Sequence, residues 1–201
     1  MKKAKLKTRT KRKADAAPAP RLSPVSYVVI GLIGLRGPST PYELKRAASR
    51  SIYYFWEFSH SQLYGEPERL TKLGLLKEKK EEGGRRRKTY SLTAAGQKAL
   101  EAWLRKPPTE LYEFRDMGVL QLFFSDFMSS ADLVALAHTQ IELCRERIAT
   151  YEEIAAHNVK RKDAARRMAP LEFGFQVTRT LLNLWTEIAA NPPPAPRKSR
   201  R

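Results

Sequence analysis

The feature that most constrains the fold is a short apolar segment, Tyr27–Leu35, which lies between two strong helix-boundary signals. Ser23 and Pro24 precede it, and serine favours the N-cap of a helix while proline favours its first residue. Gly37 and Pro38 follow it, and such a pair ends a helix. The segment is far shorter than the roughly 18 apolar residues of a membrane span. A helix that is apolar on almost every side must be buried, so we expect this one in the core of a domain.

Two more helices should follow this one. The first is expected at Pro41–Arg50, and the second should run from a cap at Ser59 or Ser61 to about Leu73. Pro67 lies inside the second of these helices and should kink or shorten it, because proline removes one helical hydrogen bond.

Two strand-like runs, residues 75–80 and 86–92, come next and flank a Gly-Gly pair at residues 83–84. This pattern predicts a β-hairpin. Thr93 should then cap a fourth helix that runs to about Leu104. Three helices, a hairpin and a fourth helix are the layout of a winged helix-turn-helix domain.

The second half of the chain is predicted to be helical. Residues 110–128 are apolar on several sides, a long helix is expected from Ala131 to about Arg161, and Pro170 should open the last helix. The predicted fold class is therefore mainly α with a small β-hairpin.

Composition divides the chain into four parts. Residues 1–22 form a basic arm that we expect to be disordered, and residues 191–201 form a basic, proline-rich tail. Residues 23–106 should be the winged helix-turn-helix domain, and residues 110–190 a helical domain for dimerisation or effector binding. Residues 110–190 have more apolar side chains than so small a domain can bury, which predicts a homodimer.

The formal net charge is +17, and most of it lies at the two ends of the chain. Basic ends suit nucleic acid or an anionic membrane surface. No segment is long enough to span a membrane, and the single cysteine, Cys144, gives no intrachain disulfide. We therefore expect a cytoplasmic, nucleoid-associated protein that binds double-stranded DNA and no membrane.

The third predicted helix has suitable chemistry for reading DNA. The residues off its leucine stripe are His60, Ser61, Gln62, Tyr64, Glu66 and Arg69. Glu66 counts slightly against a DNA contact, because a carboxylate repels phosphate. Gln62 can bond adenine through two hydrogen bonds, and Arg69 can reach a guanine or a phosphate. A solvated helix face is the alternative explanation for these polar residues.

The hairpin carries four consecutive bases, Arg85, Arg86, Arg87 and Lys88, beside its Gly-Gly turn. A cationic hairpin directly after a recognition helix is typical of a wing that contacts phosphates. The alternative is an edge hairpin whose charges only protect it from aggregation.

No pattern indicates an enzyme, a metal site or a bound cofactor. The three histidines are scattered without metal-ligand spacing, and no phosphate-binding glycine loop is present. Four aromatic residues could line a pocket for a small-molecule effector, although aromatic residues at helical spacing also form ordinary cores: Trp103, Phe173, Phe175 and Trp185.

Several of these motifs together resemble the PadR (phenolic-acid-decarboxylase regulator) family. The resemblance covers roughly residues 23–190, and its most specific part is the run Arg87–Gly96 with the helix that precedes it. Tyr42-Glu-Leu in the second helix is similar to a family element, although Pro41 replaces its glycine. Gly65 stands where many members have proline.

The resemblance implies a repressor, usually homodimeric, that leaves its operator when a small molecule or a stress signal arrives. Carried over by position, the residues that would meet DNA are Tyr42, Ser61, Gln62, Tyr64 and Arg69, with Arg85–Lys88 as the wing. An alternative function is that of an architectural protein that binds nucleic acid through its basic ends without regard to sequence.

Overall fold

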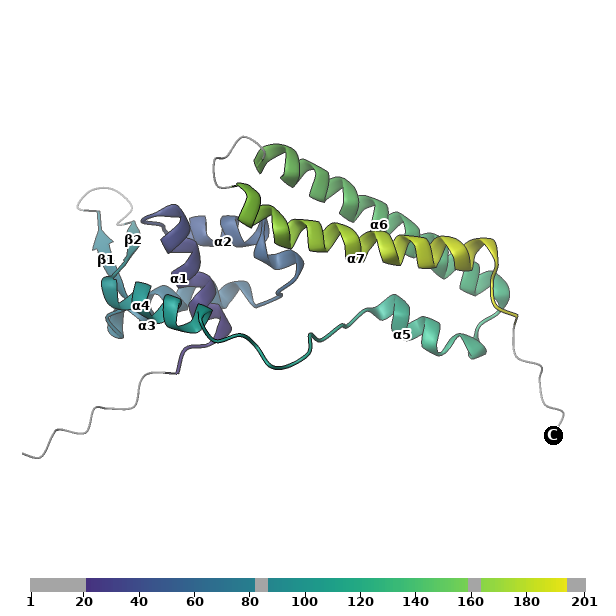
Figure 1. The fold of residues 1–201 in the computed structure, drawn as a ribbon, viewed down its shortest axis with the longest axis horizontal. Helices are drawn as coiled ribbons and strands as arrows, with labels where there is room; N and C mark the ends of the chain where they lie inside the picture. The colour runs from purple at the N-terminus through teal and green to yellow at the C-terminus, as the bar shows by residue number, and fades with distance from the viewer. Residues whose placement is uncertain (1–20, 82–86, 159–163, 195–201) are drawn as a thin grey trace, which may run out of the picture. The chain divides into compact units, whose positions relative to one another are not determined.

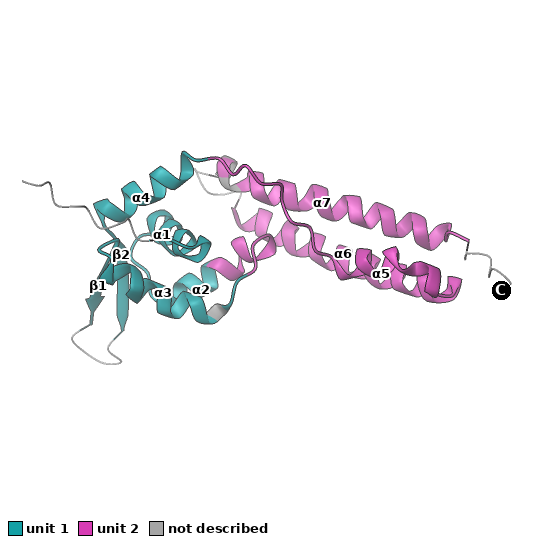
Figure 2. Ribbon diagram, turned by 90° about the horizontal axis from the view of Figure 1, so that it is seen from below, with its two compact units in different colours: residues 1–47, 58–106 teal, residues 48–57, 107–201 magenta. Residues whose placement is uncertain are grey.

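The computed structural model describes residues 21–81, 87–158 and 164–194, and the chain divides into two compact units (Figure 1, Figure 2). The first unit comprises the residues up to Ala47 together with Phe58–Lys106. The second comprises Ala48–Glu57 and the residues from Pro107 onward. Each unit has its own buried core. No helix within the described ranges is long and apolar enough to cross a membrane.

Helix α1 (Pro24–Arg36) begins and ends where the sequence predicts. The Ser23 hydroxyl accepts a hydrogen bond from the Ser26 N–H at 3.3 Å, and the Ser26 hydroxyl accepts one from the Ser23 N–H at 2.9 Å. This reciprocal pair is a capping box, which satisfies two backbone donors at once. Gly37 ends the helix with a φ of 85°, a conformation that glycine adopts without steric cost.

Helix α1 contacts α3 (His60–Lys72), α4 (Ala94–Leu104) and strand β2 (Lys88–Leu92). It is therefore the central element of the first unit, as expected for a helix without a polar face. Helix α2 (Pro41–Ser49) adds Leu44 to the same core. The core residues that are almost or fully inaccessible to solvent include Val29, Ile30, Ile33, Leu44, Leu63 and Leu70.

The predicted hairpin is confirmed. Strand β1 (Leu76–Lys80) pairs antiparallel with β2, in a register that places Glu78 opposite Tyr90. Ser39 extends the sheet, because its backbone N–H and C=O each form a 2.9 Å hydrogen bond with the backbone of Tyr90. The hairpin is thereby attached to the segment that precedes α2. The predicted turn at residues 83–84 lies outside the described residues.

The second unit is built on two long helices, α6 (Ser130–Asn158) and α7 (Ala164–Ala190), which lie side by side (Figure 1). Helix α5 (Met117–Phe123) and the short 3₁₀ helix η2 (Ser125–Phe127) precede them, and α5 contacts α6. The buried core between α6 and α7 consists of Leu133, Ala137, Ile141, Cys144, Trp185 and Ile188.

Two sequence-based expectations for the second unit are wrong. Residues 111–116 form no helix, because Asp116 adopts an extended N-cap conformation and its carboxylate accepts the Val119 N–H at 2.8 Å. The last helix begins at Ala164, so Pro170 lies inside it rather than at its start. Residues 164–169 are Ala, Arg and Met, and these strong helix formers carry the helix up to the proline.

Gly96 lies where α4 meets the start of the hairpin. Its N–H donates to the hydroxyl of Thr93, the N-cap of α4, at 3.0 Å. A Cβ atom at this position would overlap the backbone carbonyl oxygen of Leu75 and lie 2.8 Å from a methyl group of Leu92. A backbone atom cannot move aside cheaply, so the packing of α4 requires glycine here.

We predict that Gly96→Ala lowers the free energy of unfolding by about 3 kcal/mol, because of this overlap. Gly65→Ala is the matched control, since Gly65 lies in α3 with no atom within 4 Å of the added Cβ. It should raise stability by about 0.5–1 kcal/mol through helix propensity. Urea denaturation followed by circular dichroism measures both, and equal stabilities for the two variants would contradict the packing argument.

Candidate nucleic-acid interface

The first turn of α3 presents polar side chains to solvent. Ser61 and Gln62 are exposed, and Tyr64 is 48% exposed. Leu63 and Pro67 are buried on the opposite side of the helix, which fixes the outward direction of these polar groups. Ser61, Gln62 and Tyr64, which the sequence predicts as contact residues, therefore lie at the surface.

Tyr42 lies on α2 and is 61% exposed. The next residue, Glu43, points its carboxylate back to the start of the helix, where Oε2 accepts the Thr40 N–H at 2.8 Å and the Thr40 hydroxyl at 2.9 Å. These hydrogen bonds and the nearby arginines Arg87 and Arg46 hold the pKa of Glu43 below its ordinary value. Glu43 is thus ionised and fixed in direction beside an exposed tyrosine.

Arg69 is held by neighbouring side chains. Its Nε lies 2.9 Å from Oε2 of Glu66 and its Nη2 lies 2.7 Å from Oε1, which is a two-point ion pair. The same Nη2 donates to the hydroxyl of Ser26 at 3.0 Å. Burial by itself raises the pKa of Glu66, but the hydrogen bonds donated by Arg69 and Ser26 bring that pKa below its ordinary value.

The described wing cations are also in ion pairs. Arg87 lies 3.2 Å from the carboxylate of Glu43, which joins β2 to α2. Lys88 lies 3.3 Å from Glu78 and 3.7 Å from Glu68, which joins β2 to both β1 and α3. The Lys88–Glu68 pair connects the hairpin to α3, and an exposed pair of this kind contributes at most about 1 kcal/mol. Arg85 and Arg86, which complete the predicted wing, lie outside the described residues.

A hydrogen bond between Tyr90 and Glu78 closes the base of the hairpin. The Tyr90 hydroxyl donates to Oε2 of Glu78 at 3.0 Å, and only 2% of Tyr90 is exposed. Burial and this carboxylate raise the pKa of Tyr90 to about 12. The folded state therefore favours the protonated phenol.

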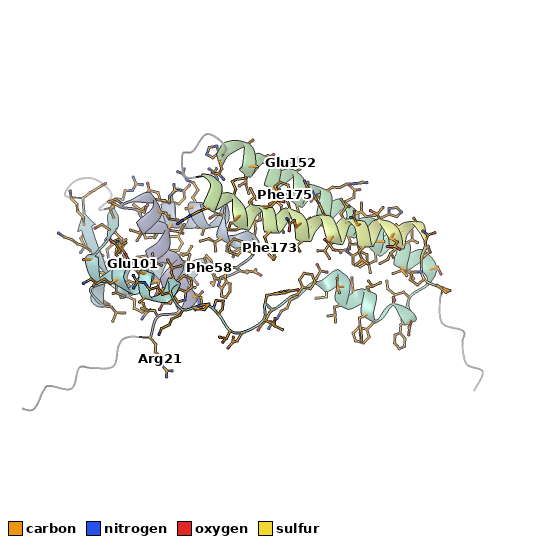
Figure 3. The ribbon with its side chains drawn as sticks, viewed as in Figure 1. Arg21, Phe58, Glu101, Glu152, Phe173 and Phe175 are labelled. Atoms are coloured by element: carbon orange, nitrogen blue, oxygen red, sulfur yellow. The ribbon has the colours of Figure 1, made fainter. Side chains whose placement is uncertain are left out.

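The aromatic residues predicted to line an effector pocket belong to both units. Trp103 belongs to the first unit, where its ring stacks on Tyr27 with 4.5 Å between centroids. On α7, Phe173 is 56% exposed whereas Phe175 is buried (Figure 3). Trp185 is fully buried and lies ten residues beyond Phe175, about 15 Å further along the helix. A shared effector pocket for these residues therefore stays a prediction.

The described residues include no group of three or more His, Cys, Asp or Glu side chains that could hold a metal ion. Cys144 is buried in the α6–α7 core, and burial raises the pKa of its thiol. A buried, protonated thiol of this kind is unreactive.

The roles of two residues at the α3 face were not recognised from the sequence. Ser26 is a fully buried serine in an apolar helix, and Glu66 is the ion-pair partner of Arg69. A serine inside an apolar helix and an acid–base pair at i,i+3 are both visible signals. The sequence does not reveal that the packing of α1 against α3 brings the side chains of Ser26, Glu66 and Arg69 together.

Two protein-family models match the chain. Residues 29–102 match the transcriptional regulator PadR-like family, and residues 114–190 match the virulence activator alpha C-terminal family. A curated relative, the negative transcriptional regulator PadR of Bacillus subtilis (strain 168), is 24% identical over 138 residues. That alignment covers 66% of this chain and 75% of the relative.

Solved structures share the fold. Bacillus subtilis PadR in complex with operator DNA has a TM-score of 0.73 at 19% identity, covering 83% of this chain and 97% of that one. The same protein in complex with p-coumaric acid has a TM-score of 0.68 at 18% identity, covering 83% and 96%. The Vibrio cholerae virulence activator AphA is 26% identical with a TM-score of 0.63, covering 83% and 96%. These similarities identify the helical, hairpin-containing architecture as a winged-helix fold with a helical C-terminal region.

We predict that Tyr90→Phe lowers the free energy of unfolding at pH 7 by about 2 kcal/mol, because it removes a buried hydrogen bond to a carboxylate. The pKa of Tyr90 rises on folding from 10.0 to about 12. Its contribution is therefore complete below about pH 10 and is lost as the pH rises through 12. In urea denaturation across this range, the stability difference between wild type and Tyr90→Phe should shrink as the pH rises.

Tyr42→Phe is the control for this experiment, since Tyr42 is 61% exposed and no DNA is present during denaturation. It should stay within about 0.5 kcal/mol of wild type at every pH. A Tyr90→Phe variant that is as stable as wild type at pH 7 would refute the role of this hydrogen bond.

Proposed function

Because the chain belongs to the PadR-like family of transcriptional regulators, we propose that it regulates transcription by binding operator DNA as a homodimer. The observation that carries the proposal is the exposed first turn of α3, with Ser61 and Gln62 at the surface, in the same unit as a basic hairpin. The N-terminal turns of a recognition helix are the part that reaches base edges in the major groove. A protein of this kind acts on the nucleoid, in the cytoplasm.

We assign the two parts of the chain different tasks. Residues 23–106 would bind DNA, and residues 110–190 would dimerise and respond to an effector. Within the first part, base or phosphate contacts would come from Tyr42, Ser61, Gln62 and Tyr64, and phosphate contacts from the wing residues Arg85–Lys88. The complex of Bacillus subtilis PadR, a protein of similar fold, with operator DNA supports DNA binding by this chain.

The direction of regulation that we propose is repression, relieved by a small molecule or a stress signal. The curated relative is a negative transcriptional regulator, and its complex with p-coumaric acid shows a small molecule bound to a protein of this fold. Activation is the second candidate, because the structurally similar AphA, at 26% identity, is a virulence activator.

Dimerisation is supported by the apolar surface of residues 111–127. Several large apolar side chains there have more than two thirds of their area exposed: Leu111, Tyr112, Met117, Phe123 and Phe127. A soluble monomer rarely exposes so many apolar groups along one short segment. We propose that a second copy of the chain covers them.

We predict that sedimentation at micromolar concentration gives twice the monomer mass of 23.0 kDa. The double variant Phe123→Lys/Phe127→Lys should shift the equilibrium to the monomer, because two ammonium groups would have to be buried at the interface. Leu35→Lys changes an exposed residue of the first unit and should leave the dimer intact. A wild-type monomer, or a dimer unaffected by the double variant, would contradict this interface.

A second prediction separates base reading from phosphate contact. Gln62→Ala should weaken binding to a duplex selected from a random library by about 1–3 kcal/mol and relax the preference at one base position. Arg87→Ala should weaken binding to selected and random duplexes alike, and should reduce the salt dependence by about one phosphate contact. Fluorescence anisotropy over a range of salt concentrations measures both.

Lys98→Ala, which removes an exposed cation from α4, is the matched control and should have little effect on either duplex. Equal losses on selected and random DNA for Gln62→Ala would favour the alternative function, a sequence-independent architectural binder. In that case the basic ends of the chain would supply the affinity.

A further inference from the structure

We propose that Glu66 and Arg69 are positioning residues that, with the buried Ser26, clamp α3 onto α1 and set the orientation of Gln62 without contacting DNA. The proposal rests on the DNA binding through α3 proposed above, and it replaces the direct DNA contact that the sequence suggests for Arg69.

The clamp is a closed set of short contacts between two helices. The Ser26 hydroxyl donates to Oε1 of Glu66 at 2.6 Å and accepts from Nη2 of Arg69 at 3.0 Å. The ion pair between Glu66 and Arg69 completes the triangle at 2.7 Å. Ser26 is fully buried and the Glu66 side chain is 12% exposed, whereas the Arg69 side chain is 43% exposed. The buried end of this hydrogen-bonded set joins α1 to α3, and such a set rigidifies the elements that it joins.

Ser26 is itself fixed in place by the capping box of α1. Its hydroxyl also accepts the Ser23 N–H at 2.9 Å and lies 3.0 Å from the Ser23 hydroxyl. The anchor for α3 is therefore the N-terminus of the most buried helix of the unit. A shift of α3 against α1 would break the Ser26–Glu66 and Ser26–Arg69 hydrogen bonds together.

Helix α3 has a particular need for an external anchor. Pro67 lies inside it, so the carbonyl of Leu63 lacks the usual helical donor. Gly65 precedes that proline and adds further backbone freedom. Both residues stand between the exposed N-terminal turn and Arg69.

The clamp lies next to the residue proposed to read bases. Gln62 is one turn ahead of Glu66, so the two side chains share a face of α3. Both, together with Arg69 and Ser23, line a shallow depression of about 240 Å³. Any rotation of α3 about its axis would therefore displace Gln62 directly.

The clamp and a direct DNA contact predict opposite effects on DNA affinity when the charge of Glu66 is removed. A free Glu66 beside DNA would repel phosphates, so Glu66→Gln would strengthen binding. A free Arg69 would attract them, so Arg69→Gln would weaken binding to every sequence and reduce the salt dependence. In the clamp the pair is neutral, and removing either member should have the same effect.

The test measures wild type, Glu66→Gln, Arg69→Gln and the double variant on a selected duplex and on a random duplex. We expect each single variant to lose affinity for the selected duplex by about tenfold, as for one lost base contact. Affinity for random DNA and its salt dependence should change by less than about twofold, since no phosphate contact is lost. The double variant should be no worse than either single variant, because the members of a clamp act as a unit.

Arg69→Lys distinguishes geometry from charge, because lysine keeps the charge but cannot form the two-point pair. The clamp predicts that it behaves like Arg69→Gln, and a phosphate contact predicts that it behaves like wild type. The control pair is Glu101→Gln and Arg105→Gln, which breaks an exposed 3.4 Å ion pair on α4 and should leave both affinities unchanged. Thermal melting of each variant verifies that it is folded.

Stronger binding by Glu66→Gln, a reduced salt dependence for Arg69→Gln, or wild-type behaviour of Arg69→Lys would each overturn the clamp. If the proposed function itself is wrong, the wild-type protein shows no preference between selected and random DNA.

Discussion

The first unit depends on the burial of a helix that has almost no polar face. Because α1 is apolar on several sides, it must be covered by several elements together, and it contacts α3, α4 and β2. This single requirement brings α3 and the hairpin onto one scaffold. The one hydroxyl buried with α1, that of Ser26, then becomes a fixed point from which side chains of α3 can be held.

Several cations in the described part of the first unit form ion pairs. Arg69, Arg87 and Lys88 each face a carboxylate, so they orient helices and strands before they meet any partner. Most of the excess positive charge of the chain lies in its two ends, residues 1–22 and 191–201. In the proposed function, the ends and the wing would supply general attraction to phosphate, and α3 would read the base sequence.

Local chemistry made much of the first unit predictable. Ser23 and Thr93 cap their helices as expected, because a cap needs only a few neighbouring residues. The start of α7 could not be placed in the same way, since tertiary packing and the helix formers before Pro170 outweigh a single start signal. Of the candidate site, exposure on α3 was predictable from the leucine pattern. The position of the Arg69 side chain was not predictable, because it depends on a hydrogen bond to Ser26, which lies 43 residues away in the sequence.

The proposed function requires that the chain read DNA sequence as a symmetric dimer. Selection of bound duplexes from a random library, using the full chain at physiological salt, tests it most directly. The account predicts an enriched inverted repeat whose half-sites are about one helical turn, roughly 10 base pairs, apart or a multiple of it. An enriched pool with no common sequence, bound with undiminished affinity, would contradict the account.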